Sequence, residues 1–294
     1  MSSIKSRNVS KEDKNAVIGG ALYLVATPIG NLSDISERAL KVMGEVDFIA
    51  AEDTRNTGKL LSCYGIQKPM VSYFEHNKRE RGEVILERLK GGESCALLTD
   101  AGTPAISDPG EDLVRLCAEN DVTVISIPGC CAVINALALS ALPTGRFCFE
   151  GFLSTNRNER FSRLEEIKND RRTTIFYEAP HKLKKTLEDI FEVFGDRKIS
   201  LCRELTKLNE EVIRTTIDGA IKLYCEIEPR GEYVLVIEGA SEEAIQSEAF
   251  FSNMTIEEHL LHYMNEGMSK MDATKAVAKD RGVAKSVIYK EINK

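Results

Sequence analysis

The segment that decides the fold reads Thr99-Asp100-Ala101-Gly102-Thr103-Pro104-Ala105-Ile106-Ser107-Asp108-Pro109-Gly110. It follows the apolar run Cys95–Leu98, which indicates a buried strand, and it precedes a helical pattern that starts near Glu111. The segment has no apolar periodicity and contains two glycines, two prolines and two aspartates, so it is more than a short connection. In α/β proteins, ligands bind at the carboxyl ends of parallel strands. The sequence therefore predicts a parallel sheet with a ligand site at this loop.

The composition is typical of a globular protein. Of the 294 residues, 43% are hydrophobic and 29% are charged, which favours one large or two smaller folded domains over a disordered chain. The eight cysteines show no metal-ligand spacing, so we expect a reduced cytoplasmic protein without a metal site. Residues 1–20 lack the apolar segment of a signal peptide, and the longest nearly apolar stretch, Cys130–Pro143, is too short to span a bilayer.

The charge is distributed unevenly along the chain. The net charge of −7 argues against a general nucleic-acid-binding protein. Residues 241–266, however, carry six acidic residues and no Lys or Arg, whereas residues 268–294 carry seven Lys or Arg and three acidic residues. Such a basic tail is typical of a nucleic-acid contact, but ordinary solvated lysines on a helical hairpin also explain it. From charge alone, we favour the second interpretation.

Strands and helices alternate through the first half of the chain. We expect strands at Ala21–Ala26, Phe48–Ala51, Met70–Phe74, Cys95–Thr99 and Val122–Ile127, with helices near 34–46, 56–64, 78–90, 111–120 and 130–142. In the second half, we expect strands at Phe147–Glu150, Thr173–Tyr177, Ile199–Arg203, Glu211–Thr216 and Glu232–Glu238, with helices near 158–169, after Pro180 and near 218–225. The first pattern predicts a parallel sheet, and the second predicts a mixed sheet with antiparallel pairs.

These patterns predict an α/β protein with two α/β domains and a small helical domain. We expect a flexible segment at residues 1–19, one α/β domain at 20–145 and a second at 146–240, with the boundary at Leu142-Pro143-Thr144-Gly145. A linker at 241–254 would lead to a helical domain at 255–294. Its Gly282 would separate two short helices, as in a helix-turn-helix or in any small helical hairpin.

Several common ligand-binding motifs are absent from the sequence. The first strand leads into Thr27-Pro28-Ile29-Gly30-Asn31, which is not the GxGxxG dinucleotide fingerprint, and the phosphate loop GxxxxGK[ST] does not occur. HExxH and GxSxG are missing as well. Common NAD enzymes, nucleoside triphosphatases, zinc proteases and serine hydrolases therefore lose support.

Polar clusters stand next to other predicted strands. In the first half, Glu52-Asp53-Thr54-Arg55 and Pro128-Gly129 follow strands. In the second half, Tyr177-Glu178-Ala179-Pro180-His181-Lys182 and Arg203-Glu204-Leu205-Thr206-Lys207 follow strands, and Arg230-Gly231-Glu232 precedes the last one. Each cluster alone would be a solvated turn, but their repeated position at strand ends predicts a shared site.

Taken together and in order, these segments resemble the tetrapyrrole (corrin/porphyrin) methylase superfamily, and most closely its branch that methylates ribosomal RNA. The resemblance is carried by LYLVATPIGNLSDIS (22–36), AAEDTRNTGKLL (50–61), LLTDAGTPAISDPG (97–110), RFCFEGFL (146–153), FYEAPHKL (176–183), RELTK (203–207) and RGEYVLVIEG (230–239). It implies an S-adenosylmethionine-dependent enzyme that methylates the ribose 2′-hydroxyl of a cytidine in the decoding region of small-subunit (16S) rRNA. It also implies a homodimer that acts on this rRNA within the assembled 30S subunit.

The resemblance places the cofactor in the cleft between the two α/β domains. By family position, the residues around it are Pro28, Gly30, Asp100, Ala101, Gly102, Thr103, Pro128, Gly129, Cys130, Cys131, Phe176, Tyr177 and Gly231. The glycines agree with this, since Gly30, Gly102 and Gly129 would let the backbone approach a ligand without a Cβ in the way. Turn formation is the alternative for each glycine, and for Gly129 alone it would suffice.

Further residues are candidates for catalysis and for RNA binding. A ribose hydroxyl is a poor nucleophile, so a positioned general base would assist the transfer. Lys207 would need an environment that lowers its pKa to serve in this way. The candidates for the base are Glu178, Lys207 and Glu52, followed by Asp53 and His181. The candidates for contacts to RNA are Arg55, Arg203, Lys275, Lys279, Lys285 and Lys290.

Two other functions stay open at the level of the sequence. The same fold could methylate a tetrapyrrole or a protein side chain, although FYEAPHK and EDTR favour the RNA branch. A non-catalytic RNA-binding or ribosome-assembly factor would explain the basic tail. Binding of S-adenosylmethionine distinguishes such a factor from the enzymes, because the factor needs no methyl donor.

Overall fold

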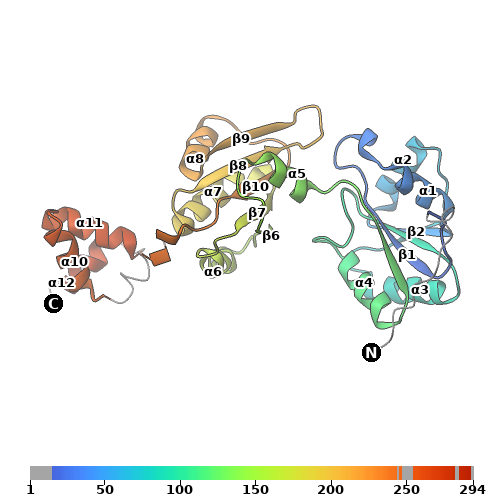
Figure 1. The fold of residues 1–294 in the computed structure, drawn as a ribbon, viewed down its shortest axis with the longest axis horizontal. Helices are drawn as coiled ribbons and strands as arrows, with labels where there is room; N and C mark the ends of the chain where they lie inside the picture. The colour runs from blue at the N-terminus through green and yellow to red at the C-terminus, as the bar shows by residue number, and fades with distance from the viewer. Residues whose placement is uncertain (1–14, 244, 247–253, 282–284, 293–294) are drawn as a thin grey trace.

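A computed structural model describes residues 15–243, 245–246, 254–281 and 285–292. Figure 1 shows three bodies in a row: two are built on five-stranded sheets, and the third is a small group of helices near the C-terminus. The predicted fold class is confirmed, because one sheet is parallel and the other is mixed. No helix within the described ranges combines the length and the apolar character needed to cross a bilayer.

The first body is a parallel sheet with the strand order β3-β2-β4-β1-β5. Its strands are β1 (Ala21–Val25), β2 (Phe48–Ala51), β3 (Met70–Ser72), β4 (Cys95–Leu98) and β5 (Thr123–Ile127). Its helices are η1 (Leu32–Asp34), α1 (Glu37–Glu45), α2 (Thr54–Cys63), α3 (Lys78–Lys90) and α4 (Gly110–Glu119). Two apolar clusters fill its faces, and β2 and β4 are buried along their whole length.

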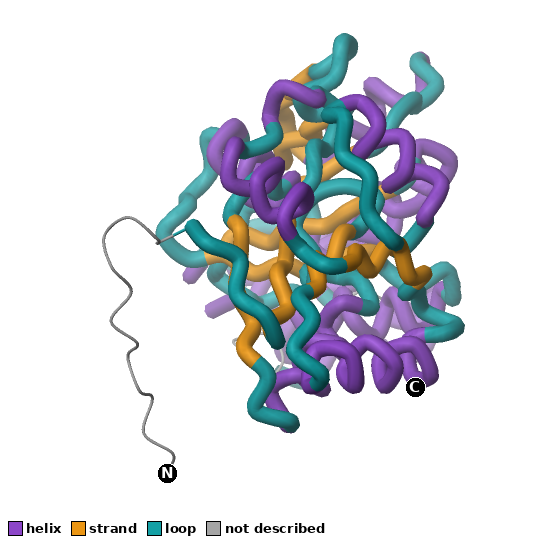
Figure 2. The backbone as a smooth tube through the Cα atoms, turned by 90° about the vertical axis from the view of Figure 1, so that its right-hand side faces the viewer, coloured by secondary structure: helices purple, strands orange, loops and turns teal. Residues whose placement is uncertain are grey.

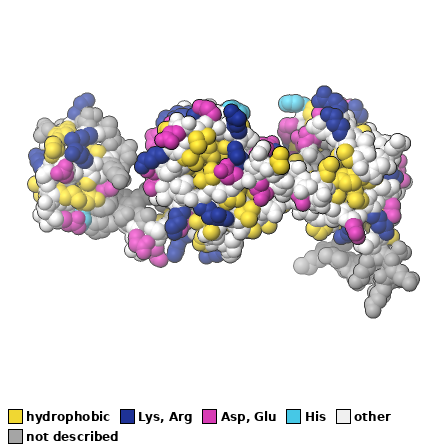
Figure 3. Space-filling view, turned by 90° about the horizontal axis from the view of Figure 1, so that it is seen from above, with side chains coloured by type: hydrophobic (Ala, Val, Ile, Leu, Met, Phe, Trp, Pro, Cys, Tyr) yellow, Lys and Arg dark blue, Asp and Glu magenta, His cyan; other side chains and the backbone are white. Residues whose placement is uncertain are grey.

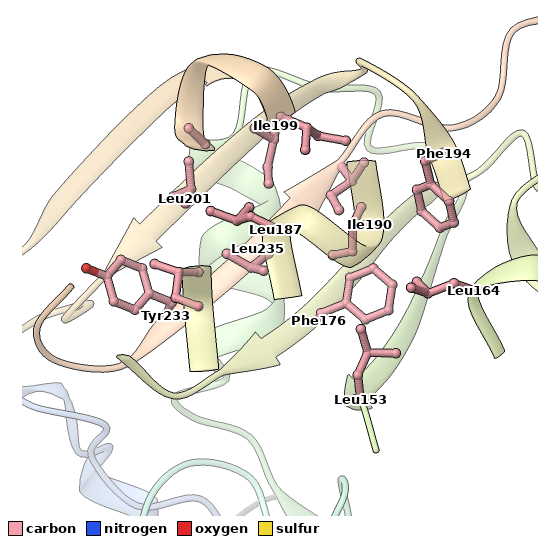
Figure 4. Packing of buried hydrophobic residues seen from close by; sticks show 14 of the residues in the cluster. Leu153, Leu164, Phe176, Leu187, Ile190, Phe194, Ile199, Leu201, Tyr233 and Leu235 are labelled. Atoms are coloured by element: carbon pink, nitrogen blue, oxygen red, sulfur yellow. The ribbon is translucent and has the colours of Figure 1, made fainter. Parts of the chain in front are cut away.

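The second body is a mixed sheet with the strand order β6-β7-β10-β8-β9. Its strands are β6 (Phe147–Phe152), β7 (Thr173–Glu178), β8 (Lys198–Arg203), β9 (Glu211–Thr216) and β10 (Tyr233–Ile237). One face carries α6 (Arg157–Ile167), α7 (Pro180–Phe194) and α8 (Ile217–Glu226). Figure 4 shows the core on this face, where Phe176 and Leu235 from the sheet pack against Leu187 and Ile190 of α7.

Helix α5 (Ala132–Leu139) covers the other face of the second sheet. Its Val133 and Ala136 pack with Ile175 and Val234, which belong to β7 and β10. The boundary predicted at Leu142-Pro143-Thr144-Gly145 would assign this helix to the first domain. Packing places the change from the first body to the second before α5 instead, as Figure 1 also shows.

The small helical body contains α10 (Ile256–Asn265), α11 (Lys270–Asp280) and α12 (Lys285–Ile292). A capping box at Thr255 and Glu258 starts α10. Ala273, Val277, Ala278 and Ile288 are buried in its core together with Leu260. The predicted turn at Gly282 lies outside the described residues. Figure 2 looks along the row of bodies and shows the strands of the sheet-containing bodies between helices, and Figure 1 shows α10, α11 and α12 at one end of the row.

Candidate active site

The strand ends of the two sheets meet along one seam. All strands of the first sheet run in parallel, so the loops after β1, β2, β4 and β5 lie at a single edge. In the second sheet, Tyr233 at the start of β10 pairs with Glu178 at the end of β7 and with Arg203 at the end of β8. The two edges touch where Gly30 lies against the loop after β8. The predicted convergence of the polar clusters is therefore confirmed.

Two adjoining cavities lie along this seam. The first, of about 270 Å³, is bordered mainly by apolar groups and by both sides of the seam. The second, of about 170 Å³, is bordered by the loop after β4 and by several hydroxyl and carboxylate groups. The two cavities share the lining residues Ile29, Ala101, Ala132, Phe152 and Tyr177. Together they form one cleft of the size and mixed lining that small-molecule sites have.

Backbone contacts hold the loop after β4 in place. Gly102 has a φ of +88° and exchanges two backbone hydrogen bonds with Thr27, of 2.9 and 3.1 Å. This φ lies in the left-handed region that glycine adopts without strain. The Thr103 hydroxyl donates a hydrogen bond of 2.9 Å to the carbonyl of Cys130 in the loop after β5. The loops after three neighbouring strands are thus joined into one wall of the cleft.

Asp108 organises the second half of the same loop. Its carboxylate accepts hydrogen bonds from the backbone N–H of Ala105, at 3.0 Å, and of Gly110, at 2.7 Å. Ala105 and Ser107 have φ values of 67° and 62°, which are costly for residues with a Cβ. Burial raises the pKa of the Asp108 carboxyl, and the nearby charge of Glu52 adds to the shift. Asp108 lines the second cavity and therefore both shapes the loop and faces the cleft.

The sequence analysis did not single out Asp108 as a site residue. The sequence does contain a signal for this role. In the pattern Asp-Pro-Gly at the start of a helix, the Asp side chain often accepts a hydrogen bond from the backbone N–H group two residues later. The cleft residues Phe152 and Val234 are also not among the predicted site residues. They belong to apolar stretches whose pattern gives no sign that one side chain faces a cavity.

The two carboxylates among the three main candidate bases border the cleft from fixed positions. Glu52 lines the second cavity, and its Oε2 accepts a hydrogen bond of 2.8 Å from the Thr99 hydroxyl. Glu178 lines the first cavity, and its two oxygens accept hydrogen bonds from the Thr186 hydroxyl and from the backbone N–H of Ala179. Oε1 of Glu52 has no such partner among the described residues. Glu52 is thus the candidate that keeps an acceptor oxygen available.

Lys207 is the third candidate, and the structure corrects this prediction. Its Nζ lies 2.8 Å from Glu204 and 2.9 Å from Glu232. Burial lowers the pKa of Lys207, but hydrogen bonds to the two carboxylates outweigh burial, so the pKa lies above the usual value. A general base needs a neutral amine, and this side chain is held as an ammonium ion. Lys207 lines the first cavity as a fixed positive charge instead.

Asp53 and His181 are also poor bases in this structure. The Arg55 side chain donates hydrogen bonds to both oxygens of Asp53, and these bonds lower the pKa of Asp53 to about 2. Asp53 also caps α2 by accepting a bond from the backbone N–H of Arg55. His181 is exposed in the first turn of α7 and lines neither cavity.

The predicted cofactor residues fall into three groups. Ala101, Gly102, Thr103, Cys131 and Tyr177 line the cleft, and burial raises the pKa of Tyr177 to about 12. A second group belongs to the same loops but lines neither cavity: Pro28, Gly30, Asp100, Pro128, Gly129, Cys130 and Gly231.

Phe176 forms the third group, and its prediction is corrected. Its side chain is fully buried in the core of the second body (Figure 4). Neighbouring residues of a strand point to opposite faces of the sheet, so Phe176 and Tyr177 cannot both face the cleft. Tyr177 therefore reaches the cleft and Phe176 does not.

At three of the predicted glycines, neighbouring protein atoms lie so close that a side chain would not fit, so no ligand is needed to explain the glycine. A Cβ on Gly129 would lie 2.8 Å from the Cβ of Ala26, so the alternative of a tight turn suffices there. A Cβ on Gly231, whose φ is +76°, would collide with the side chain of Glu204. A Cβ on Gly30 would collide with Lys207 and would lie 2.9 Å from the carbonyl oxygen of Leu205. These glycines keep the walls of the cleft close together.

The candidate RNA contacts differ in their exposure. The Arg55 side chain is 85% exposed although it pairs with Asp53. Arg203 is mostly buried and pairs with Glu211 at 3.1 Å, so it is bound within the protein. In the helical body, the lysines near the surface are Lys275, Lys285 and Lys290, and the side chain of Lys279 lies outside the described ones. In Figure 3, Lys and Arg occur on all three bodies, interspersed with acidic side chains.

Comparison with protein families gives one match, to the family described as Tetrapyrrole (Corrin/Porphyrin) Methylases, over residues 21–221. Among curated proteins, the chain is 46% identical to "Ribosomal RNA small subunit methyltransferase I" of Halalkalibacterium halodurans over 92% of this chain and 93% of that protein. The proteins of the same name from Bacillus subtilis and Escherichia coli O157:H7 are 45% and 42% identical, again over 92% of this chain, and over 93% and 94% of their own lengths.

Solved structures show the same fold at lower identity. Uroporphyrin-III-C-methyltransferase from Thermus thermophilus matches with a TM-score of 0.54 and 17% identity, over 74% of this chain and 94% of that one. Diphthine synthase matches with a TM-score of 0.56 and 15% identity, over 74% of this chain and 90% of that one. At this level of identity the likeness concerns the fold alone and does not favour a tetrapyrrole or protein acceptor.

Within the described residues, no group of three or more His, Cys, Asp or Glu side chains could hold a metal ion. The absence of a metal requirement remains a prediction.

Proposed function

The chain belongs to the tetrapyrrole (corrin/porphyrin) methylase family, and on that premise we propose that it methylates the ribose 2′-hydroxyl of a cytidine in the decoding region of 16S rRNA. The names of its relatives and its family support an S-adenosylmethionine-dependent methyltransferase of small-subunit rRNA, without specifying which atom of which nucleotide is methylated. The ribose position, the cytidine, the 30S context and the homodimer rest on the resemblance that the seven quoted segments carry together, among which FYEAPHK and EDTR favour the RNA branch. One observation carries the proposal: the family segments converge on a single cleft.

The residues of this cleft fit S-adenosylmethionine. The second cavity contains the carboxylate of Asp108, which suits a donor that carries a positive sulfonium and an ammonium group. The first cavity offers Ile29, Tyr177 and Val234 as apolar and aromatic surface for an adenine ring. We therefore assign the wall formed by Ala101–Thr103 and Cys131, together with Tyr177, to the cofactor.

Within this site, each residue has a physical task in methyl transfer. S-adenosylmethionine supplies an electrophilic methyl group, and the ribose oxygen displaces the sulfur in line. The backbone of Gly102 and Thr103 is fixed by Thr27 and Cys130, so a bound donor would be held in one position. Glu52 is anchored by Thr99 and keeps Oε1 available to accept the proton of the attacking hydroxyl. Lys207 pairs with Glu204 and Glu232 and would hold the wall of the other cavity in place.

The proposal is tested by two measurements on the full chain. Calorimetry with S-adenosylmethionine should show saturable binding, and labelled donor should transfer its methyl group to the RNA of small subunits that lack the modification. Absence of donor binding would support the non-catalytic assembly factor. Transfer of the label to ribosomal protein instead of RNA would contradict the proposed acceptor.

Gly30→Ala should weaken donor binding by about tenfold. The added Cβ would lie 2.9 Å from the Leu205 carbonyl oxygen, and this backbone atom cannot swing away as a flexible side chain can. The loops after β1 and β8 must therefore separate, which widens the cleft. Calorimetry with S-adenosylmethionine measures the loss.

Gly44→Ala is the matched control for this prediction. Gly44 lies in α1, and an added Cβ would have no neighbour within 4 Å. This variant should keep the donor affinity of the wild type and should gain up to about 1 kcal/mol of stability, because alanine favours a helix more than glycine does. Equal donor affinities of the two variants would contradict the assigned role of Gly30.

Deletion of residues 250–294 should weaken RNA binding and leave donor affinity unchanged. The tail is the part of the chain with a local excess of Lys and Arg, and its Lys275, Lys285 and Lys290 lie on helices whose apolar residues form a separate core. The loss should shrink as salt rises, because released counterions supply the free energy of phosphate contacts.

Binding of the full and shortened chains to small-subunit rRNA at several salt concentrations measures this effect. Unaltered RNA affinity at low salt would exclude the tail from RNA binding. A shortened chain that has also lost donor binding would assign the tail a structural role.

A further inference from the structure

We propose that Phe152 is a stacking surface for the base of the nucleotide that is being methylated. The inference rests on the proposed function and adds a subsite for a nucleobase to it. Phe152 is the last residue of β6 and lines both cavities of the cleft. It is 59% exposed, which is unusual for a large aromatic residue at the end of an otherwise ordered strand. An exposed aromatic side chain in a cleft is a candidate ligand contact.

A β-bulge puts Phe152 in this position. In the pairing of β6 with β7, Phe149 lies opposite Ile175, but the next pair is Gly151 with Phe176, so that β6 has one extra residue, Glu150. Regular alternation would point Phe149 and Phe152 to opposite faces of the sheet. The extra residue brings both to one face, and bulges are known to re-aim side chains next to active sites.

Gly151 makes this bulge possible, and Tyr177 shows its result. Gly151 has a φ of +67°, in the left-handed region that favours glycine. The ring of Tyr177 then contacts both phenylalanines, with ring centroids 4.9 Å from Phe149 and 5.5 Å from Phe152. Phe149 is half-buried in this aromatic group, whereas Phe152 extends from it into the cleft. Packing therefore accounts for Phe149 and leaves most of Phe152 without a partner.

The chemistry of the reaction supplies an occupant. To bring one ribose of structured RNA into a cleft between two bodies, the enzyme would draw that nucleotide out of its stack, which costs stacking energy. Proteins recover this energy by stacking the exposed base on an aromatic side chain. Phe152 has no polar group to read base edges, so it would hold a base by its flat face while the ribose reaches the second cavity. The donor has other apolar surface available at Ile29 and Val234.

The test compares Phe152 variants in methyl transfer to small subunits that lack the modification. Phe152→Ala should lower the single-turnover rate at subsaturating subunit by roughly fivefold to a hundredfold, the effect of losing one stacked base. Phe152→Trp should restore the rate to within about threefold of the wild type, because a larger ring still stacks. Phe147→Ala is the control, since Phe147 lies at the other end of β6 and lines neither cavity.

The outcomes separate this inference from the proposed function. A wild type that transfers no methyl group to the RNA would refute the proposed function itself. An active wild type with an equally active Phe152→Ala variant would refute the stacking role alone. Donor affinity that falls in parallel with the rate of Phe152→Ala would assign Phe152 to the donor and would also overturn the inference. The stacking role requires donor affinity to stay within about threefold of the wild type.

A second readout uses the absence of tryptophan from the chain. Phe152→Trp then contains a single tryptophan, whose emission should decrease saturably when a protein-free cytidine oligonucleotide is added, because a base stacks on its ring. Phe147→Trp is the matched control and should show no saturable decrease. Equal responses of the two variants, or no response of Phe152→Trp, would contradict the proposed subsite.

Discussion

The Glu52→Gln variant should transfer methyl groups about a hundredfold more slowly than the wild type, the lower range for loss of a general base. Glutamine keeps the size of the side chain and can still accept the hydrogen bond from Thr99. It cannot accept the proton of the ribose hydroxyl. Single-turnover rates with saturating donor and saturating small subunit measure the effect on the chemical step.

Glu178→Gln is the control for this prediction. Both oxygens of Glu178 already accept hydrogen bonds, from Thr186 and from the backbone of Ala179, so its role is to hold the start of α7. This variant should lose less than about tenfold in rate. The assignment of Glu52 fails if its variant keeps the wild-type rate, or if Glu178→Gln is the slower of the two. A fall in donor affinity equal to the fall in rate would move Glu52 from proton transfer to donor binding.

The Asp108→Ala variant should bind S-adenosylmethionine about a hundredfold more weakly than the wild type. The carboxylate holds the N–H groups of Ala105 and Gly110, and each unmade bond costs about 1–3 kcal/mol. Ala105 and Ser107 would also leave their left-handed conformations, since nothing else fixes them as directly. The loop that borders the second cavity would then change shape. Calorimetry with the donor measures the loss.

Asp108→Asn separates the hydrogen bonds from the charge. Its amide oxygen can replace Oδ1, which accepts from both Ala105 and Gly110, so the loop should keep its shape. We expect this variant to bind the donor within about tenfold of the wild type. Far-ultraviolet circular dichroism should show that both variants remain folded. Wild-type donor affinity in Asp108→Ala would exclude the loop from the donor site.

The sheets and the position of the cleft could be predicted because they depend on local patterns. Cys95–Leu98 is apolar throughout and is followed by a loop with two prolines, so both the strand and its end are readable in the sequence. The parallel arrangement follows from the helices between the strands, and it brings the strand ends to one edge. The segments that carry the family resemblance lie at those ends for the same reason.

The residues that differ from the predictions depend on contacts between distant segments. Strand β7 is buried on both faces and reads TTIFYE, so the sequence alone does not tell which of Phe176 and Tyr177 faces the cleft. The charge state of Lys207 is set by Glu204 and by Glu232, and Glu232 is 25 residues away in the chain. Helix α5 lies on the second sheet because its apolar face packs against Val234 and Val236 there. The predicted boundary came from Pro143, which follows this helix in the sequence.

The most direct test of the central claim, that this cleft methylates small-subunit rRNA at a ribose, is to map the methyl group. Small subunits that lack the modification are incubated with the protein and labelled S-adenosylmethionine, and the labelled nucleotide is identified by mass spectrometry of the digested RNA. We predict one labelled cytidine in the decoding region, with the methyl group on the ribose 2′-oxygen, and a much lower yield with Glu52→Gln. A methyl group on a base, at another nucleotide or on no RNA at all would contradict the account.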